Sequence, residues 1–277
     1  MTGNHISPRH RSARPAARCT VLGVATAILL AASVAPAAPV PIATRQASAH
    51  AMRYHISLPV GWSAKREWPV VVVIPDAARE FVPNLQAFVA AREDRPYILV
   101  APEVLTCGGT RTRTIEHYSY SRAVWDSLAG IDDFAFDDAG IAAVLADVQR
   151  KDHGESTAFL TGWEAGGHTV WALTFRHPER WRGVAPVTTN YQRRGLEPSS
   201  FSAAPQRTRL PIQVFREGAP TGEIVGAMAA LDQQTARALD DARVHGYAPK
   251  PVRIVPGADH GPLASAVLAW CDSVRGR

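Results

Sequence analysis

Seven short apolar runs, separated by longer helical patterns, constrain the fold of this chain more than any other feature. The run at residues 70–74 consists of four valines and an isoleucine, which favours a central strand buried on both faces. The run at 52–59 alternates between apolar and polar side chains, as an exposed strand does. The other five runs lie at residues 97–101, 157–161, 183–187, 211–215 and 251–255.

Apolar side chains at helical spacing occupy the segments between these runs. Ile141, Val144, Leu145 and Val148 form one stripe. Two more stripes consist of Ile224, Met228, Leu231, Ala238 and Ala242, and of Leu263, Val267, Trp270 and Val274. Strands that alternate with helices predict an α/β domain of three layers, in which a mostly parallel central sheet has helices on both faces.

A long excursion, residues 104–136, follows the predicted strand at 97–101. Long loops at the carboxyl ends of parallel strands often shape a binding site. The aromatic side chains of Tyr118, Tyr120 and Trp125 therefore either line a pocket for an apolar ligand or lie on the surface of the loop. Both interpretations stay open at this point.

The N-terminus has the pattern of a secretory signal peptide. Residues 1–18 contain four arginines and no acid, and a short apolar run follows at 19–35. Small residues at 35–37 and 47–49 offer cleavage sites, so we expect a signal peptide over 1–35 with cleavage as late as residue 49. Residues 36–49 are interpreted as a linker and 50–277 as a single domain. This predicts a protein of the periplasm, cell envelope or exterior, without a stable membrane span after cleavage; the alternative is an uncleaved anchor.

Charge and cysteine content narrow the classes of partner. The net charge of +5 comes from five arginines in residues 1–49, and the rest of the chain has as many basic as acidic residues. This removes the electrostatic argument for a nucleic acid or an anionic membrane as partner. Only Cys107 and Cys271 lie beyond the leader, and their pairing stays open. No motif for a cofactor or a metal is present, and the oligomeric state is not indicated.

The stretch LTGWEAGGHTVW, residues 160–171, has the layout of a nucleophile elbow. Gly162 and Gly166 lie two positions before and two after Glu164, where they let a strand and a helix approach closely. An apolar strand pattern precedes this turn, and a helical pattern that contains His168 follows it. His168 is expected to pack against the next strand. The residue at the point of the turn is therefore a glutamate.

With this elbow the chain resembles the α/β-hydrolase family, in particular secreted esterases and polyester depolymerases. The resemblance covers roughly residues 52–277. SLPVGWSAKREWPVVVVIP is similar to the opening hairpin and first central strand of that family, and VRIVPGADHGP to the segment that carries its catalytic histidine. The resemblance implies that Glu164 takes the place of the serine nucleophile and that His260 is the histidine. In the family an aspartate orients the catalytic histidine. Pro220 falls near the position of that aspartate here, so Glu217 or Glu223 would have to take its role.

The resemblance also implies an oxyanion hole, formed by the N–H of Ala165 and that of Ala77 or Ala78. However, the first strand is followed by Asp76 where the family has His-Gly, and a carboxylate has the wrong sign to stabilise an oxyanion. Asp76 and Glu103 both follow predicted strands at the same edge of the sheet. If they reach Glu164 and His260, they form an oxygen-rich pocket, although no metal-binding spacing supports a cation there.

Two hypotheses of different classes follow. A carboxylate that attacks an ester must form a mixed anhydride, which lies uphill of the ester, so hydrolysis through an acyl-serine is not expected. The first hypothesis is a non-catalytic or strongly altered relative that binds an apolar, ester-like or polyester-like ligand. The alternative is an active hydrolase in which Glu164 is the nucleophile or general base and His260 assists.

Overall fold

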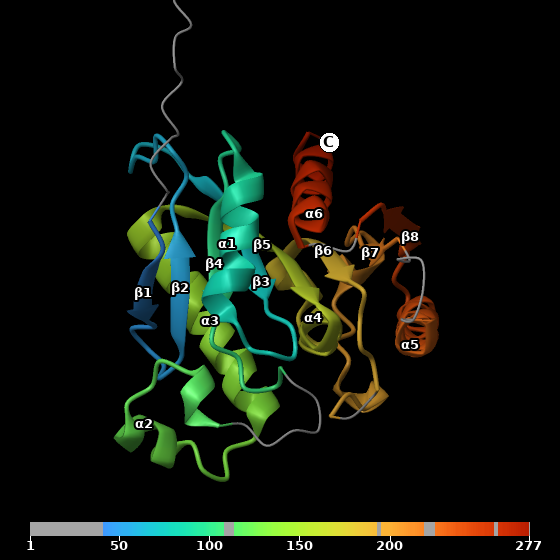
Figure 1. The fold of residues 1–277 in the computed structure, drawn as a ribbon, viewed down its shortest axis with the longest axis horizontal. Helices are drawn as coiled ribbons and strands as arrows, with labels where there is room; N and C mark the ends of the chain where they lie inside the picture. Colours follow the sequence, from blue (N-terminus) through green and yellow to red (C-terminus); the bar gives the residue numbers. More distant parts are fainter. Residues whose placement is uncertain (1–40, 108–113, 193–194, 219–224, 258–259, 277) are drawn as a thin grey trace, which may run out of the picture. The chain divides into compact units, whose positions relative to one another are not determined.

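The computed structural model describes residues 41–107, 114–192, 195–218, 225–257 and 260–276 (Figure 1). Within these ranges eight strands form one sheet in the order β1-β2-β4-β3-β5-β6-β7-β8. Strands β3 to β8 are parallel to one another, whereas β2 is antiparallel both to β4 and to β1. The strands are β1 Ala43–Gln46, β2 Arg53–Ser57, β3 Trp68–Ile74, β4 Ile98–Pro102, β5 Gly154–Trp163, β6 Trp181–Val187, β7 Gln213–Glu217 and β8 Lys250–Val255.

Helices cover both faces of this sheet, which confirms the predicted three-layer α/β class. Helices α1 and α6 lie on one face, and α3, α4 and α5 on the other (Figure 1). Most buried side chains of the two groups belong to separate hydrophobic clusters. The α-helices are α1 Phe81–Arg92, α2 Arg122–Ser127, α3 Asp133–Asp152, α4 Glu164–Arg176, α5 Val225–Val244 and α6 His260–Arg275. Short 3-10 helices span Ile115–His117, Pro178–Arg180, Pro198–Ser200 and Pro205–Thr208.

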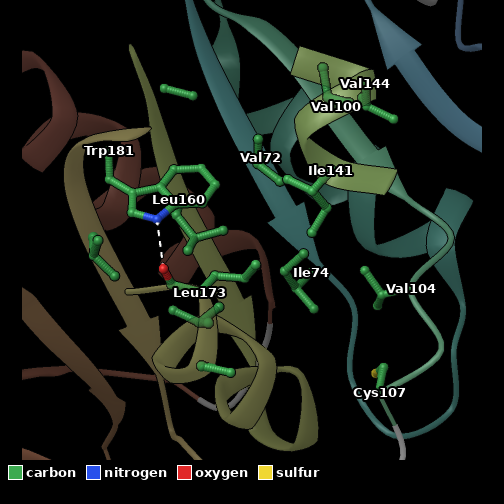
Figure 2. Packing of buried hydrophobic residues seen from close by; sticks show 14 of the residues in the cluster. Val72, Ile74, Val100, Val104, Cys107, Ile141, Val144, Leu160, Leu173 and Trp181 are labelled. Atoms are coloured by element: carbon green, nitrogen blue, oxygen red, sulfur yellow. Dashed lines mark hydrogen bonds between the residues drawn. The ribbon is translucent and has the colours of Figure 1, made fainter. Parts of the chain in front are cut away.

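The β-branched run of β3 lies at the centre of the sheet, between β4 and β5, and all of its side chains are buried. Successive side chains point to opposite faces, so Val72 and Ile74 pack with Val100, Leu160 and the α3 side chain Ile141 (Figure 2). The indole of Trp181 donates a hydrogen bond of 3.1 Å to the carbonyl oxygen of Leu173. Valines on both faces explain why this strand reads as a continuous apolar run.

The edge strand β1 corrects two expectations from the sequence. Residues 43–46 pair with β2 and are not a linker, and the Arg45 guanidinium forms an ion pair of 2.7 Å with Asp152. Because β1 and β4 flank it, β2 is buried from Tyr54 to Ser57 and is not an exposed strand. The domain therefore begins before residue 50, and cleavage after residue 49 would remove β1. The predicted signal peptide lies outside the described residues.

The aromatic residues of the excursion are neither a pocket lining nor a surface feature. Tyr118 and Tyr120 are buried, and their rings stack at a centroid distance of 5.8 Å. The Tyr118 ring also contacts Phe81 of α1 at 5.6 Å and the half-buried Trp125 at 5.0 Å. Both phenol oxygens reach backbone carbonyl groups of the β4 end, at Val104 and Glu103. The excursion thus extends the hydrophobic core.

The two described cysteines are both free thiols. Cys107 belongs to the cluster on the α3–α4 face of the sheet and Cys271 to the cluster on the α1–α6 face. Burial raises the pKa of Cys271 well above its usual value. With the sheet between them, the two side chains do not pair.

Candidate active site

The turn from β5 into α4 has the backbone of a nucleophile elbow. Glu164 follows the last residue of β5 directly and has a φ of 39°, a left-handed conformation that costs free energy for a residue other than glycine. A Cβ on Gly166 would lie 2.1 Å from the carbonyl oxygen of Pro75. A Cβ on Gly162 would lie 2.8 Å from a Val170 methyl carbon. These glycines let β5, α4 and the end of β3 meet closely, and Glu164 projects from this junction.

The Glu164 side chain is exposed, and its carboxylate makes no hydrogen bond or ion pair with any described residue. Its backbone carbonyl accepts a hydrogen bond of 2.8 Å from the Asn190 N–H, which fixes the turn. Neighbouring protein atoms displace part of the carboxylate's hydration and raise the pKa of Glu164; the charge of Asp76 raises it further. His260 acts in the opposite direction. The protonated form is thus more populated than in an isolated glutamate.

His260 is the first residue of α6 and is half-buried at the same edge of the sheet. Its imidazole stacks on the indole of Trp163, with ring centroids 4.4 Å apart and an angle of 28° between the planes. The two predicted residues are therefore close enough to interact electrostatically, but they form neither a hydrogen bond nor an ion pair. The imidazole is held by stacking on the residue that precedes Glu164.

Glu217 ends β7, the strand that lies next to β8 in the sheet. Its backbone N–H donates to the Thr188 hydroxyl over 3.3 Å, and Thr188 follows the end of β6 with a φ of 44°. Ends of parallel strands meet at one edge of a sheet, which places Glu217 on the same edge as Glu164. The alternative acid, Glu223, lies outside the described residues, as does Ile224 of the predicted helical stripe.

One of the two backbone N–H groups predicted for an oxyanion hole on the loop after β3 already has a hydrogen-bond acceptor. The carboxylate of Asp76 accepts a hydrogen bond of 3.0 Å from the Ala78 N–H, and the carbonyl of Asp76 accepts from the Arg79 N–H at 3.2 Å. This leaves Ala77 as the candidate on this loop. Ala165 lies in the first turn of α4, where backbone N–H groups have no partner within the helix, and the preceding residue provides no side-chain cap.

Glu103 does not join Asp76, Glu164 and His260 in an oxygen-rich pocket. It is 1% exposed, and its carboxylate accepts hydrogen bonds from the backbone and hydroxyl of Ser119. The same carboxylate lies 3.2 Å from Nε2 of His55, whose other ring nitrogen lies 2.9 Å from the Thr44 hydroxyl. Glu103 therefore fastens the excursion to the antiparallel strands. Among the described residues no group of three His, Cys, Asp or Glu side chains is placed to hold a metal ion.

Three neighbours of the elbow carried no signal in the sequence. Trp163 supports His260, and the Cys107 sulfur lies 3.0 and 2.7 Å from the carbonyl oxygens of Pro75 and Asp76, either of which can accept its thiol proton. Arg79 is buried beside this thiol. Single residues in irregular loops have no periodicity, so only the fold brings them together. His168 is buried, and its ring lies against Phe134 of α3 and Tyr191, which follows β6, the strand against which it was expected to pack.

A hollow of about 320 Å³ lies at the opposite end of α4 from Glu164. Its lining includes Phe201, Arg207 and His245. The Phe201 ring stacks on Phe175, near the C-terminal end of the helix. About 18 Å of helix separates the two ends at a rise of roughly 1.5 Å per residue. The hollow is therefore not part of the edge that carries Glu164.

No family model and no curated protein matches this sequence. Solved structures do match it. A poly(aspartic acid) hydrolase from Sphingomonas is 14% identical with a TM-score of 0.57, over 84% of this chain and 98% of that one. A poly(3-hydroxybutyrate) depolymerase from Bordetella parapertussis is 17% identical with a TM-score of 0.55, over 84% and 90%. A candidate dipeptidyl aminopeptidase IV from Bacteroides ovatus is 14% identical with a TM-score of 0.56.

The match covers 84% of this chain but only 35% of the Bacteroides protein, so the chain spans about a third of that protein's length. At these identities the likeness establishes the fold. The chain has an α/β-hydrolase-like fold, as the structures of esterases and depolymerases do. The chemistry at its elbow has to be argued from its own residues.

Proposed function

We propose that this protein is a hydrolase-fold relative that binds ester-like or polyester-like small molecules at the Glu164 edge and does not form an acyl-serine. One observation carries the proposal: the residue at the strained point of the elbow, with a φ of 39°, is a glutamate whose carboxylate is unpaired among the described residues. Attack on an ester by that carboxylate would give a mixed anhydride, uphill of the substrate.

The surroundings of Glu164 support an altered role. In serine hydrolases a neutral histidine accepts the proton of the hydroxyl group, and backbone N–H groups stabilise the oxyanion. Here His260 stacks on Trp163 without a hydrogen bond to Glu164, and Asp76 contributes a negative charge to the same region. The first feature leaves residue 164 without a hydrogen-bonded proton acceptor, and the second opposes the development of negative charge on an ester oxygen.

A second candidate function is hydrolysis with Glu164 as a general base. The observation in its favour is the raised pKa of Glu164, because a general base works best when its pKa approaches the working pH. His260 would then help to position water or the leaving group. In this case activity would depend on the carboxylate and not on any hydroxyl group.

We place the protein outside the cytoplasm, on the strength of the arginine-rich start and apolar run of the sequence. Because β1 begins at Ala43, the proposed cleavage falls before that strand, near residues 35–37. Among the described residues no helix is long and apolar enough to cross a membrane. A small-molecule ligand remains the proposed partner.

Hydrolysis of activated short- and medium-chain esters tests the proposal. We expect the purified wild-type protein to show turnover no faster than Glu164→Gln, because neither has a hydroxyl nucleophile. Glu164→Ser is expected to gain measurable turnover, since the elbow that presents residue 164 is intact. If wild type turns over the esters and Glu164→Gln does not, Glu164 is catalytic and the second candidate replaces the first. The panel should include 3-hydroxybutyrate oligomers, after the Bordetella depolymerase.

A further inference from the structure

Arg79 is a buried arginine without a counter-ion among the residues that the structure describes. It is 6% exposed, and its Nε atom is shielded from solvent and has no hydrogen-bond partner. Among the described residues no carboxylate lies within ion-pair distance of its guanidinium. A buried charge without a partner is costly, and buried charges in proteins are therefore paired or bind a ligand. The residue also has a φ of 57°, a second cost that functional sites often carry.

A second buried arginine in the same chain shows what a structural role requires. Arg92 is 1% exposed, and its guanidinium donates to the carbonyl oxygens of Ser57 and Tyr97, both at 3.0 Å, and to the Ser57 hydroxyl at 3.1 Å. Burial lowers the pKa of Arg92 to about 10. Arg92 thus connects α1 with β2 and the start of β4. Within the described ranges Arg79 has no comparable set of backbone acceptors.

The guanidinium of Arg79 lies at the edge of the sheet that carries Glu164. It interacts with the Tyr118 hydroxyl and with the thiol of Cys107. Burial raises the pKa of that thiol; the charge of Arg79 lowers it, and the charge of Glu164 raises it. Arg79 belongs to the loop after β3, and the first residue of that loop, Pro75, lies against Gly166 of the elbow and 3.0 Å from the Cys107 sulfur through its carbonyl oxygen. The Asp76 carboxylate accepts from the Ala78 N–H and forms no ion pair with Arg79.

We propose that Arg79 binds a carboxylate group of the ligand, so that the ligands are esters which also carry a free carboxylate. The planar guanidinium matches a carboxylate with two parallel hydrogen bonds, and an arginine that is already desolvated binds an anion strongly. The Tyr118 hydroxyl beside it donates to the carbonyl oxygen of Val104, so the guanidinium is the group that would bind the carboxylate. This inference rests on the proposed function, which places the ester group at Glu164.

Binding of monoethyl succinate and of diethyl succinate tests the inference. The two probes share the ester and differ in one carboxylate. We expect the wild-type protein to bind the monoester more tightly in an NMR titration. Arg79→Met should raise the Kd of the monoester about tenfold or more and leave that of the diester unchanged, because a hydrogen bond to a charged group is lost. The Kd of Arg79→Lys for the monoester should lie between those of the wild type and Arg79→Met, because lysine keeps the charge but lacks the planar guanidinium.

Thermal unfolding separates a binding residue from a structural one. Arg79→Met is expected to melt at or above the wild-type temperature, because it removes an uncompensated buried charge. The matched control Arg92→Met is expected to melt lower, because it leaves the Ser57 and Tyr97 carbonyl groups without their donor. Monoethyl succinate should raise the melting temperature of the wild type but not that of Arg79→Met.

Equal binding of the two probes by the wild type would overturn the inference, as would an Arg79→Met protein that melts lower and keeps its monoester affinity. Neither result concerns the residue at the elbow, so the proposed function would stand. Conversely, an acyl-serine on the wild-type protein would overturn the proposed function, while carboxylate-dependent binding at Arg79 would still be measurable.

Discussion

Replacement of Gly166 by alanine is expected to lower the free energy of unfolding by about 3 kcal/mol, near the upper end of overpacking costs. The new Cβ would lie 2.1 Å from the carbonyl oxygen of Pro75. Because this neighbour is a backbone atom at the end of the central strand β3, it cannot turn away as a side chain would. The elbow would have to open, which moves α4 and Glu164 away from the sheet. Urea unfolding of wild type and variant measures the difference.

Gly261→Ala is the matched control for this experiment. Gly261 lies in the first turn of α6, and a Cβ there meets nothing within 4 Å. Alanine is the better helix former, so we expect an unchanged or slightly higher stability. Equal stabilities of Gly166→Ala and wild type would contradict the close approach of α4 to β3, and with it the assignment of the turn as an elbow.

The second large effect is expected for Asp137→Asn, which should lower the free energy of unfolding by about 3 kcal/mol near pH 5. The fully buried Asp137 carboxyl accepts hydrogen bonds from the N–H groups of Leu105 and Thr106 at 2.7 and 2.9 Å, and from the Thr106 hydroxyl at 2.6 Å. An asparagine amide presents only one oxygen to these donors, so at least one buried backbone N–H loses its acceptor. The loop after β4 would loosen, and the Thr106 hydroxyl links that loop to Thr169 of α4.

The cost of Asp137→Asn is expected to shrink as the pH rises. Burial raises the pKa of Asp137 to about 7, although the three hydrogen bonds act in the opposite direction. In the unfolded chain the pKa is near 4, so between about pH 4 and pH 7 the folded protein binds more protons than the unfolded one. The contribution of this group to wild-type stability therefore falls with rising pH, by up to about 1.4 kcal/mol per pH unit. The asparagine variant lacks this slope.

Unfolding by urea at several values from pH 4.5 to 7.5 measures this difference. Asp132→Asn serves as the control, since Asp132 is the exposed N-cap of α3 and asparagine caps a helix equally well. We expect the free energy of unfolding of Asp132→Asn to stay within about 0.5 kcal/mol of the wild-type value. The difference in free energy of unfolding between wild type and Asp137→Asn would contradict this prediction if it were constant or grew with pH. The hydrogen bonds would then outweigh burial in setting the pKa of Asp137.

The strands and the elbow could be predicted because their signals are local and repeated. All seven predicted runs became strands, and the glycine spacing around Glu164 indicated the junction of β5 and α4. The edge strand β1 could not be predicted, because its sequence ATRQ has no apolar pattern and it is held by pairing to β2. Its ion pair to Asp152 joins residues more than a hundred positions apart.

The details of the site were predicted less well, for a related reason. Glu103 follows a strand at the expected edge, but its carboxylate pairs with the buried His55 of β2. The burial of Tyr118 and of Arg79 depends on how the excursion folds back onto the loop after β3. Neither position has a periodic or motif signal. Contacts between two irregular segments appear only in three dimensions.

Covalent labelling tests most directly whether this fold works without a serine nucleophile, with a carboxylate at the elbow in its place. The protein would be incubated with a fluorophosphonate, which reacts with the activated hydroxyl of serine hydrolases, and its intact mass would then be measured. We expect no adduct on the wild-type protein and an adduct at position 164 of Glu164→Ser. A stoichiometric adduct on a hydroxyl group of the wild-type protein would contradict this expectation, because the nucleophile would then lie elsewhere in the fold.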